Sequence, residues 1–411
     1  MLVFDRRTEL GDAPMLHALV IGVSEYPNLP NGASDIVQFD DKKTLGLRSL
    51  SCAAYSACKI VQWLLDNRDS TVAPLGTVRL LLSPNEEERI RIASLPAFLT
   101  EITAWSPATL EALEICAPEW RSDANHCVEN ATWFYFCGHG FQTKTQKQAL
   151  ILNDFGQRQG SRLKHTVSIE NIFTGMAPTP TFTSMAETQF YFVDSCRDTA
   201  SGLDRFTGSY AQEPSAIWDV EPEQRDRRNA PVFYGTLGGV QAYSLVGQES
   251  VFCRALLKCL PEFASERIDA PNHAWAVTTG ALQRALSQYF DTLSATEGGG
   301  QETSVSGKIG RTNAILLYHA QPPNVLLNLR MVTAPVDETQ LSLFDERRNR
   351  VLHKGPPLVP HPYSFDTVAG FYTAEVEFPD NPVISPFVQG KMLWPPDRFP
   401  AECDWNLAST Y

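Results

Sequence analysis

The sequence predicts an α/β protein with a mainly parallel sheet, followed by a small all-β domain. Short apolar segments alternate with amphipathic ones up to about residue 319, which is the pattern of an α/β domain. The apolar segments are nearly continuous, as in parallel strands that are buried on both faces. After residue 320 apolar and polar residues alternate instead, as in half-buried strands.

Six apolar segments have the composition expected of buried strands. Helices are expected between them, so right-handed crossovers should join the strands into one α/β/α sandwich with a six-stranded, mainly parallel sheet. The expected strands are 16–23, 78–83, 132–137, 188–195, 231–237 and 312–319.

Four segments are expected to be helices. In 52–65 the apolar side chains recur on one helical face, which is typical of a helix packed on a sheet. The other three expected helices are 86–103, 251–263 and 275–292.

Two stretches interrupt this alternation. Residues 199–230 are polar and charged without a sustained period, so we expect a long exposed loop, which is uncommon in a compact domain unless it has a function. Residues 296–311 are rich in glycine and serine and are expected to form a flexible connection or a hairpin tip.

The chain of 411 residues is too long for one ordinary core. We therefore expect two domains, 1–319 and 320–411. The second should be a small β-rich accessory domain, because its alternating segments are separated by prolines.

Composition excludes several classes of protein. The net charge of -13 disfavours binding to nucleic acid phosphates. No stretch approaches the 18 or so apolar residues of a membrane helix, and the N-terminus lacks the pattern of a signal peptide. We expect a cytoplasmic protein that binds neither nucleic acid nor membrane. The nine cysteines form no CxxC pair, which argues against a disulfide framework and a zinc ribbon.

A histidine and a cysteine follow two neighbouring expected strands. Strand 132–137 ends on Gly138-His139-Gly140, and Cys196 follows strand 188–195. The carboxyl ends of strands in an open α/β sheet line the ligand crevice, so we expect the imidazole and the thiol to meet there. The alternative is an unrelated α/β protein in which both residues are structural.

A Cys/His pair of this kind suits nucleophilic catalysis. A free cysteine with a pKa of ~8.5 is mostly protonated at neutral pH, so a neighbouring histidine is needed to activate it or to protonate the leaving amine. The backbone N–H groups of Gly140 and Cys196 are candidate donors to the oxyanion. On this interpretation Gly140 lacks a side chain to leave room for substrate.

Five segments, in order, resemble the bacterial caspase-like cysteine peptidases of the caspase, metacaspase and CHAT group. They are HALVIGVSEYPNL, LRSLSCAAYSAC, FYFCGHGF, FYFVDSCRD and VFYGTLGGVQAYS, within residues 15–319. The resemblance implies a caspase-like fold and a cysteine endopeptidase without a cofactor that cleaves proteins or peptides, with His139 and Cys196 as its catalytic pair. It also implies a possible role in bacterial defence or cell death. It further implies that residues 235–243 form a wall that binds an extended substrate.

The resemblance departs from true caspases two residues before the nucleophile. Asp194 is similar to the metacaspase pattern and implies cleavage after Arg or Lys, because a carboxylate pairs with a basic P1 side chain. Alternatively, Asp194 caps a turn or tunes Cys196. Tyr55 and Ser56 stand where metacaspases tend to have Asn and Asp, so a second acidic wall is not expected.

The loop 199–230 lies where members of this family are cut during activation. It contains Arg225, Arg227 and Arg228, which are P1 residues of the type that Asp194 should prefer. We expect a zymogen that is cleaved after one of them by itself or by an upstream protease. The alternative is that these arginines are merely solvated.

No metal site is expected. Asp154 could belong to a calcium site like those of some metacaspases, but no cluster of oxygen ligands at fixed spacing supports one, so calcium dependence stays open. A different class of function is a catalytically idle caspase-like adaptor that binds partners through 320–411.

Overall fold

The computed structural model describes most of the chain in two compact units. The first comprises residues 1–257 and 293–316, and the second 258–292 and 317–411. The second unit therefore takes in 258–292, which the sequence assigned to the first domain. The described residues are 1–29, 47–143, 147–156, 163–197, 213–219, 226–236, 247–270, 273–297, 302–308, 310, 313–332, 336–358, 361–395 and 402–408.

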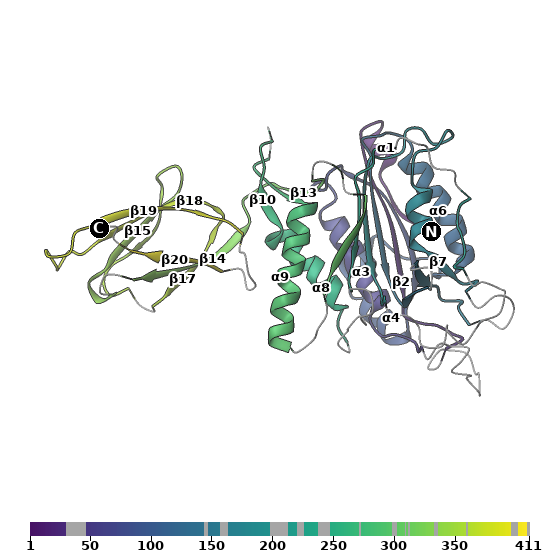
Figure 1. Cartoon of the computed structure of the whole chain (residues 1–411), viewed down its shortest axis with the longest axis horizontal. Helices are drawn as coiled ribbons and strands as arrows, with labels where there is room; N and C mark the ends of the chain where they lie inside the picture. The colour runs from purple at the N-terminus through teal and green to yellow at the C-terminus, as the bar shows by residue number, and fades with distance from the viewer. Residues whose placement is uncertain are drawn as a thin grey trace. The chain divides into compact units, whose positions relative to one another are not determined.

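A seven-stranded sheet forms the centre of the first unit (Figure 1). Its five inner strands are parallel, and the two edge strands are antiparallel to their neighbours. The predicted α/β class is therefore confirmed. In spatial order the strands are β1 (Leu2–Asp5), β3 (Leu75–Ser83), β2 (Leu16–Val23), β4 (Ala131–Cys137), β8 (Thr188–Asp194), β9 (Ala230–Tyr234) and β12 (Ser304–Lys308).

The edges of this sheet differ from the prediction of six strands. The expected sixth strand, 312–319, forms β13 (Ile315–His319) in a separate sheet. There β13 pairs with β11 (Trp275–Thr278), and β11 pairs on its other side with β10 (Ser265–Arg267). Its place is taken by β12, which lies in the segment expected to be a flexible connection. Because β12 is a half-exposed edge strand with no buried residue, it lacks the apolar run that marks the inner strands.

Helices cover both faces of the central sheet. Figure 1 shows α3 (Ala53–Asp66) and α6 (Leu110–Ala124) on opposite faces, and both pack on β2. The approach of α3 is close, because a Cβ atom on Gly22 would lie 2.6 Å from the Cβ atom of Ala57. The sequence missed α6, which contains Pro118 and a less regular apolar face.

The other predicted helices differ from the observed ones in their bounds. The segment 86–103 forms two helices separated by a break, 251–263 ends in a π-helical turn, and 275–292 begins as strand β11 before the helix starts. These elements are α4 (Glu86–Ile92), α5 (Pro96–Thr100), α8 (Val251–Lys258), η2 (Cys259–Phe263) and α9 (Thr279–Glu297); α1 (Arg7–Leu10) and α7 (Ile169–Gly175) were not predicted.

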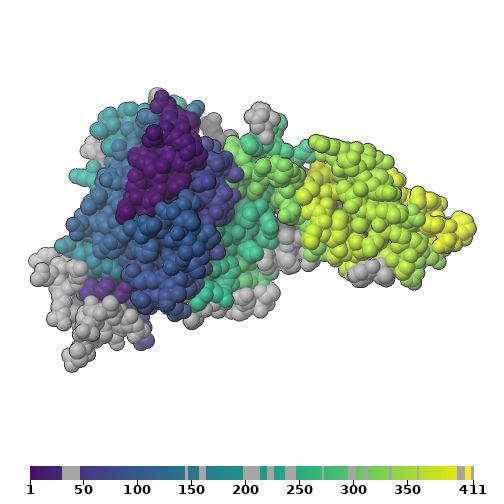
Figure 2. Space-filling view, turned by 180° about the vertical axis from the view of Figure 1, so that it is seen from behind, coloured from purple at the N-terminus to yellow at the C-terminus, as the bar shows by residue number. Residues whose placement is uncertain are grey.

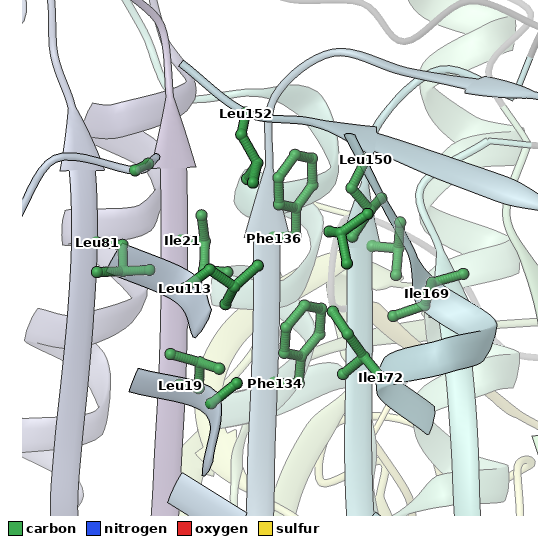
Figure 3. Close-up of a cluster of buried hydrophobic side chains, with 14 of the residues drawn as sticks. Leu19, Ile21, Leu81, Leu113, Phe134, Phe136, Leu150, Leu152, Ile169 and Ile172 are labelled. Carbon is green, nitrogen blue, oxygen red and sulfur yellow. The ribbon is translucent and has the colours of Figure 1, made fainter. Parts of the chain in front are cut away.

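One hydrophobic core of the first unit lies on the α6 face of the sheet. A small antiparallel sheet of β5 (Gly140–Gln142), β6 (Gln148–Ile151) and β7 (Thr166–Ser168) closes this core at the carboxyl end of β4. Side chains from the central strands, α6, α7 and β6 meet there (Figure 3), among them Leu19, Ile21, Leu81, Leu113, Phe134, Phe136, Leu150, Ile169 and Ile172.

The N-terminal strand and helix lie at the surface beside α6 (Figure 2). Arg7 on α1 forms an ion pair of 2.8 Å with Asp123 of α6. The same carboxylate pairs at 2.8 Å with the buried Arg79 of β3. The ion pairs therefore join the edge of the sheet to its covering helix.

The second unit contains two sheets in which most strand pairs are antiparallel, which confirms the all-β prediction for residues 320–411. One sheet has the order β17-β14-β20 and the other β16-β15-β18-β19. Their inner side chains share one core that includes Leu327, Leu343 and Trp405. The strands are β14 (Asn324–Met331), β15 (Gln340–Phe344), β16 (Arg350–Lys354), β17 (Tyr363–Val368), β18 (Gly370–Glu377), β19 (Phe387–Leu393) and β20 (Glu402–Leu407), with a 3-10 turn, η3 (Val336–Glu338), before β15.

No helix in the part of the chain that the structure describes has both the length and the apolar character needed to cross a bilayer.

Candidate active site

The carboxyl ends of β4 and β8 lie side by side. The two strands are parallel and in register, with Cys137 opposite Asp194. The N–H of Gly138 continues the ladder by donating to the carbonyl of Asp194 at 3.2 Å. His139 and Cys196 follow directly, so the fold brings the two strand ends that carry them to one edge of the sheet.

One hydrogen bond fixes the His139 ring. Its Nε2 atom lies 2.6 Å from the carbonyl oxygen of Arg48. A carbonyl can only accept, so Nε2 carries the proton and Nδ1 is the basic nitrogen. Burial lowers the pKa of His139 to about 4, although the bond to Arg48 acts in the opposite direction. The imidazole is therefore neutral at pH 7 and able to accept a proton.

The backbone around Arg48 is held in place by its neighbours. Leu50 donates its N–H to the carbonyl of Ser24 at 2.7 Å, and the side chain of Asn85 donates to the carbonyl of Leu50 at 2.9 Å. The Ser49 hydroxyl oxygen accepts the N–H of Tyr26 at 3.2 Å. The acceptor that orients His139 thus belongs to an anchored segment.

Tyr26 supports the same histidine from the other side. Its buried hydroxyl accepts the N–H of His139 at 2.9 Å and donates to the carbonyl of Ile151 at 3.3 Å. The two ring centroids are 5.0 Å apart. A Cβ atom on Gly138 would lie 3.0 Å from the Tyr26 hydroxyl, so glycine leaves room for this contact. Sequence reasoning missed Tyr26, whose only signal is its place after an apolar strand.

Gly140 permits close packing between its turn and the segment of Ser195. A Cβ atom there would lie 2.6 Å from Oγ of Ser195 and 2.8 Å from Nε2 of Gln148. Neither Gly138 nor Gly140 has a positive φ, so both glycines permit close approach and not a left-handed turn.

The N–H of Gly140 lies outside the ladder between β5 and β6. Ile151 donates its N–H to the carbonyl of His139 at 2.9 Å. Gly140 and Leu150, the next pair in the register, therefore form a non-hydrogen-bonded pair. This N–H is directed away from β6.

Neighbouring side chains anchor the segment that carries Cys196. The hydroxyl of Thr236 donates to the carbonyl of Ser195 at 3.1 Å. The Arg197 guanidinium lies 4.1 Å from the Tyr234 ring centroid and donates to Oγ of Ser304 at 3.0 Å. Cys196 itself is half-buried.

Asp194 points into the interior of the unit. It is 3% exposed, and its Oδ2 atom accepts hydrogen bonds from the Tyr135 hydroxyl at 3.0 Å, the Cys137 thiol at 3.3 Å and the Ser250 hydroxyl. Burial raises the pKa of Asp194, and the three donors act against this shift. Among the described residues no Lys or Arg forms an ion pair with it.

The thiol of Cys137 is not suited to nucleophilic attack. The side chain is buried, and burial raises its pKa well above the usual value.

The loop expected at 199–230 is not wholly exposed, which corrects the prediction. In the described segment 213–219, Ser215 forms a parallel bridge to Val167 of β7. Trp218 lies directly over Gly175, where a Cβ atom would come within 2.0 Å of its ring. The side-chain oxygen of Asn171 accepts the N–H of Ile217 at 2.7 Å. Contacts of α7 and β7 therefore anchor this segment.

The three arginines proposed as cleavage sites differ in position. Arg225 lies outside the described residues, and Arg227 is exposed. Arg228 is only 1% exposed, is paired with Asp226 at 2.9 Å and donates to Oε1 of Gln189 at 3.0 Å. The expectation of an accessible arginine is therefore corrected for Arg228, which a protease could reach only after local unfolding.

The expected substrate wall at 235–243 is described only at Gly235 and Thr236, and residues 237–243 lie outside the described part. Ser56, at the position of the second acid of metacaspases, is buried, and its hydroxyl donates to the carbonyl of Cys52 at 2.7 Å. It also accepts the N–H of Ser250 at 2.9 Å.

Metal ligands do not gather in the described ranges, where no group of three or more His, Cys, Asp or Glu side chains is arranged to hold an ion. Asp154 contacts His165 at 2.7 Å and accepts the N–H of Leu110 at the start of α6. These contacts give Asp154 a structural role.

One family model matches part of the sequence. Residues 104–281 match the family model described as caspase domain, a range that includes both His139 and Cys196. The resemblance to caspase-like peptidases is therefore confirmed over this range. No curated protein sequence matches at a significant level.

Among solved structures, the chain shows similarity to caspases at low sequence identity. Caspase-1 from Spodoptera frugiperda is 12% identical, with a TM-score of 0.40, and the match covers 76% of this chain and 96% of the caspase. The structure entitled pro-sf-caspase-1 is 12% identical, with a TM-score of 0.38, and the match covers 73% and 89% of the two chains. A protein from Geobacter sulfurreducens is 11% identical, with a TM-score of 0.39, and the match covers 73% and 95%.

Proposed function

We propose that this chain, which carries a caspase domain match over residues 104–281, is a cysteine endopeptidase. Cys196 is the nucleophile and His139 the general acid and base. The observation that carries the proposal is the bond of 2.6 Å between Nε2 of His139 and the carbonyl of Arg48. It leaves Nδ1 as the basic nitrogen on the strand end beside that of Cys196.

The proposed reaction has two steps. Nδ1 of His139 takes the thiol proton, the thiolate of Cys196 attacks the scissile carbonyl carbon, and the C–N bond breaks as the imidazolium gives its proton to the leaving amine. Water then adds to the thioester, with His139 accepting its proton, and releases the acid and the free thiol. The N–H groups of Gly140 and Cys196 donate to the oxyanion in both steps.

We propose cleavage after Arg or Lys, with Asp194 as the specificity determinant. Support comes from the electrostatics of this carboxyl, which has three neutral donors but no cationic partner in the described part of the chain. A guanidinium or ammonium group would supply the missing positive charge. Because Asp194 is buried, the P1 side chain must displace a neutral neighbour to reach it.

Activation by cleavage is also proposed. Arg225 and Arg227 are the candidate sites, because the ion pair and burial of Arg228 oppose its entry into a protease cleft. The anchored segment 213–219 would keep the upstream fragment bound after a cut at either site. The activating protease is the chain itself or an upstream enzyme, and a role in defence or cell death rests on the resemblance alone.

The test of the proposal is turnover of a fluorogenic peptide with arginine at P1. Cys196→Ala should remove turnover and retain the fold, because the side chain lies at the sheet edge. The matched control is Cys127→Ala, which removes another half-buried thiol from the same unit and should retain turnover.

Turnover by Cys196→Ala at the native rate, in protein free of other proteases, would refute the assignment of the nucleophile. Absence of turnover in the native chain after cleavage at 225 or 227 would favour the idle adaptor instead.

A further inference from the structure

We propose that Gln148 is a positioning residue for the nucleophile. Its side-chain amide fixes the carbonyl of Cys196, and through it the direction of the thiol. This inference rests on the proposed function, and it adds a residue of β6 that neither the strand ends nor the family match identify.

The amide nitrogen of Gln148 makes two hydrogen bonds to the nucleophile segment. Nε2 donates to the carbonyl oxygen of Cys196 at 2.7 Å and to Oγ of Ser195 at 3.1 Å. One NH₂ group carries two hydrogens, so both bonds form together. The side chain is 1% exposed, which removes competition from water.

Chemistry determines the orientation of this amide. The carbonyl of Cys196 needs a donor, and only the NH₂ end of the amide can supply one. The other end, Oε1, is buried without a hydrogen-bond partner among the described residues. Leaving an acceptor buried in this way is unfavourable. The amide therefore keeps its two bonds to Ser195 and Cys196 although its oxygen has no hydrogen-bond donor in the described part of the chain.

Gln148 is itself held in place. Its N–H donates to the carboxylate of Glu170 at 3.0 and 3.2 Å, and that carboxylate also accepts the hydroxyl of Ser168 at 2.7 Å. β6 pairs with β5 on one side and β7 on the other. The amide thus projects from the middle strand of a small sheet.

Both peptide planes that flank the Cα atom of Cys196 are fixed. Thr236 holds the carbonyl of Ser195, and since a trans peptide is planar, this sets the opposite direction of the Cys196 N–H. Gln148 holds the next carbonyl, that of Cys196 itself. With the two planes set, the Cα–Cβ bond has one direction, and only rotation about χ1 remains for the thiol.

The same amide connects the two catalytic strand ends. A Cβ atom on Gly140 would lie 2.8 Å from Nε2 of Gln148 and 2.6 Å from Oγ of Ser195, so these three groups are in close contact. The turn that carries His139 therefore packs on the side chain that holds Cys196. A shift of Gln148 would move thiol and imidazole relative to each other.

The first test compares Gln148→Met with the native chain on a fluorogenic peptide with arginine at P1. Methionine keeps the volume and removes both donors. We expect kcat to fall by about 10²-fold, because a displacement of about 1 Å in a catalytic group has an effect of this order, and KM to change by less than about twofold. An unchanged kcat together with a rise in KM of about 10²-fold would contradict a positioning role.

The second test uses Gln148→Glu, which retains the shape of the side chain. At pH 8 an ionised carboxylate cannot donate to the carbonyl of Cys196, whereas the protonated form at pH 5.5 can. Burial raises the pKa of such a carboxyl, which brings protonation into this range. The ratio of mutant to native kcat should rise by about tenfold from pH 8 to pH 5.5, while the ratio for Gln148→Met stays flat. A flat ratio for Gln148→Glu would overturn the proposal.

A third readout does not depend on peptidase activity. Iodoacetamide alkylates Cys196 at a rate that depends on the fraction of thiolate. Mass spectrometry of the peptide that contains Cys196 measures this rate. Unfolding in urea is the control that each variant is folded. The rate at pH 7 should fall several-fold in Gln148→Met if the amide aligns the thiol with His139. An unchanged rate in a folded variant would overturn the proposal, even if the native chain cleaves no peptide tested.

Discussion

His139 and Asp194 lie near the ends of neighbouring strands, and burial shifts their pKa values in opposite directions. Burial lowers the pKa of the imidazole to about 4 and raises that of the carboxyl. In both cases the neutral form is favoured. His139 has the fixed hydrogen bond that a neutral base needs, whereas Asp194 has only neutral donors. His139 can therefore act as a base, whereas Asp194 has no cationic partner among the described residues.

This difference teaches that position at a strand end does not by itself define a role. Sequence reasoning placed His139 and Cys196 at one edge because each follows a strand, and it assigned Asp194 to the substrate pocket by resemblance to metacaspases. The half-buried His139 and Cys196 lie beyond the last strand residues, but Asp194 is the last residue of β8 and points inward. The predictions below test whether the two regions act separately.

The largest effect is expected from His139→Ala. Loss of the neutral base should reduce kcat by about 10²–10⁴-fold, while the Asp194 region, and with it the preference for a basic P1 residue, stays the same. Steady-state kinetics on matched peptides ending in Arg and Ala measure both quantities. A changed P1 preference would show that the two regions are coupled.

Asp194→Asn should act on specificity instead. The preference for arginine over alanine at P1 should fall by about tenfold or more, because a charge-assisted bond is replaced by a neutral one. Robust cleavage after aspartate by the native chain would contradict the assignment of a basic S1 pocket.

Asp194→Asn should also change how the stability of the fold depends on pH. The folded pKa of Asp194 is raised, so the folded chain binds the proton more tightly, and native stability is lost as pH rises through that pKa. Relative to native, Asp194→Asn should therefore gain stability between pH 4 and pH 7, as urea unfolding would report. A relative loss over this range would mean that the carboxylate is stabilised by a charge.

Tyr26→Phe tests the support of His139. It leaves the buried N–H of His139 without its acceptor, which should lower the free energy of unfolding by about 1–3 kcal/mol and reduce kcat. The control is Tyr55→Phe, which keeps the ring that contacts Arg91. This variant should unfold at the same urea concentration as the native chain. Equal unfolding midpoints for the two variants in urea would contradict the role of the Tyr26 hydroxyl.

The smallest effect is expected from acid. His139 is neutral in the folded state down to about pH 4, but the unfolded chain binds a proton near pH 6.5, so stability falls as pH drops through this interval. The slope per histidine is at most about 1.4 kcal/mol per pH unit. His17, whose burial also lowers its pKa to about 4, adds to it. Urea unfolding of His139→Gln between pH 7 and pH 5 should show a shallower slope than native.

Much of the fold could be predicted because the inner strands carry a strong local signal. β2 and β4 are buried along their whole length and β8 along nearly all of it, so each strand contains a continuous apolar run. Edge strands β1 and β12 carry no such run, because one side of an edge strand meets solvent. These two edge strands were therefore not predicted, whereas the half-buried strands after residue 320 were recognised by their alternation.

The site was predictable only where chemistry depends on residue type. His139 and Cys196 are marked by their side chains, but the partner of Nε2 is a backbone carbonyl, which any residue at position 48 would provide. Gln148 and Tyr26 contact the site from other elements, and no local pattern gives such distant contacts. The buried Arg228 was misjudged for the same reason, because its partners are set by the tertiary fold.

The central claim is that His139 activates Cys196 for attack on a peptide with a basic P1 residue. Covalent labelling tests this claim most directly. The probe is an arginine chloromethylketone peptide, applied to the native chain, Cys196→Ala and His139→Ala, with mass spectrometry to locate the adduct. We expect one adduct on Cys196 in the native chain, none in Cys196→Ala and a rate lower by about 10²-fold or more in His139→Ala. Labelling of another cysteine at the native rate in Cys196→Ala would contradict the account.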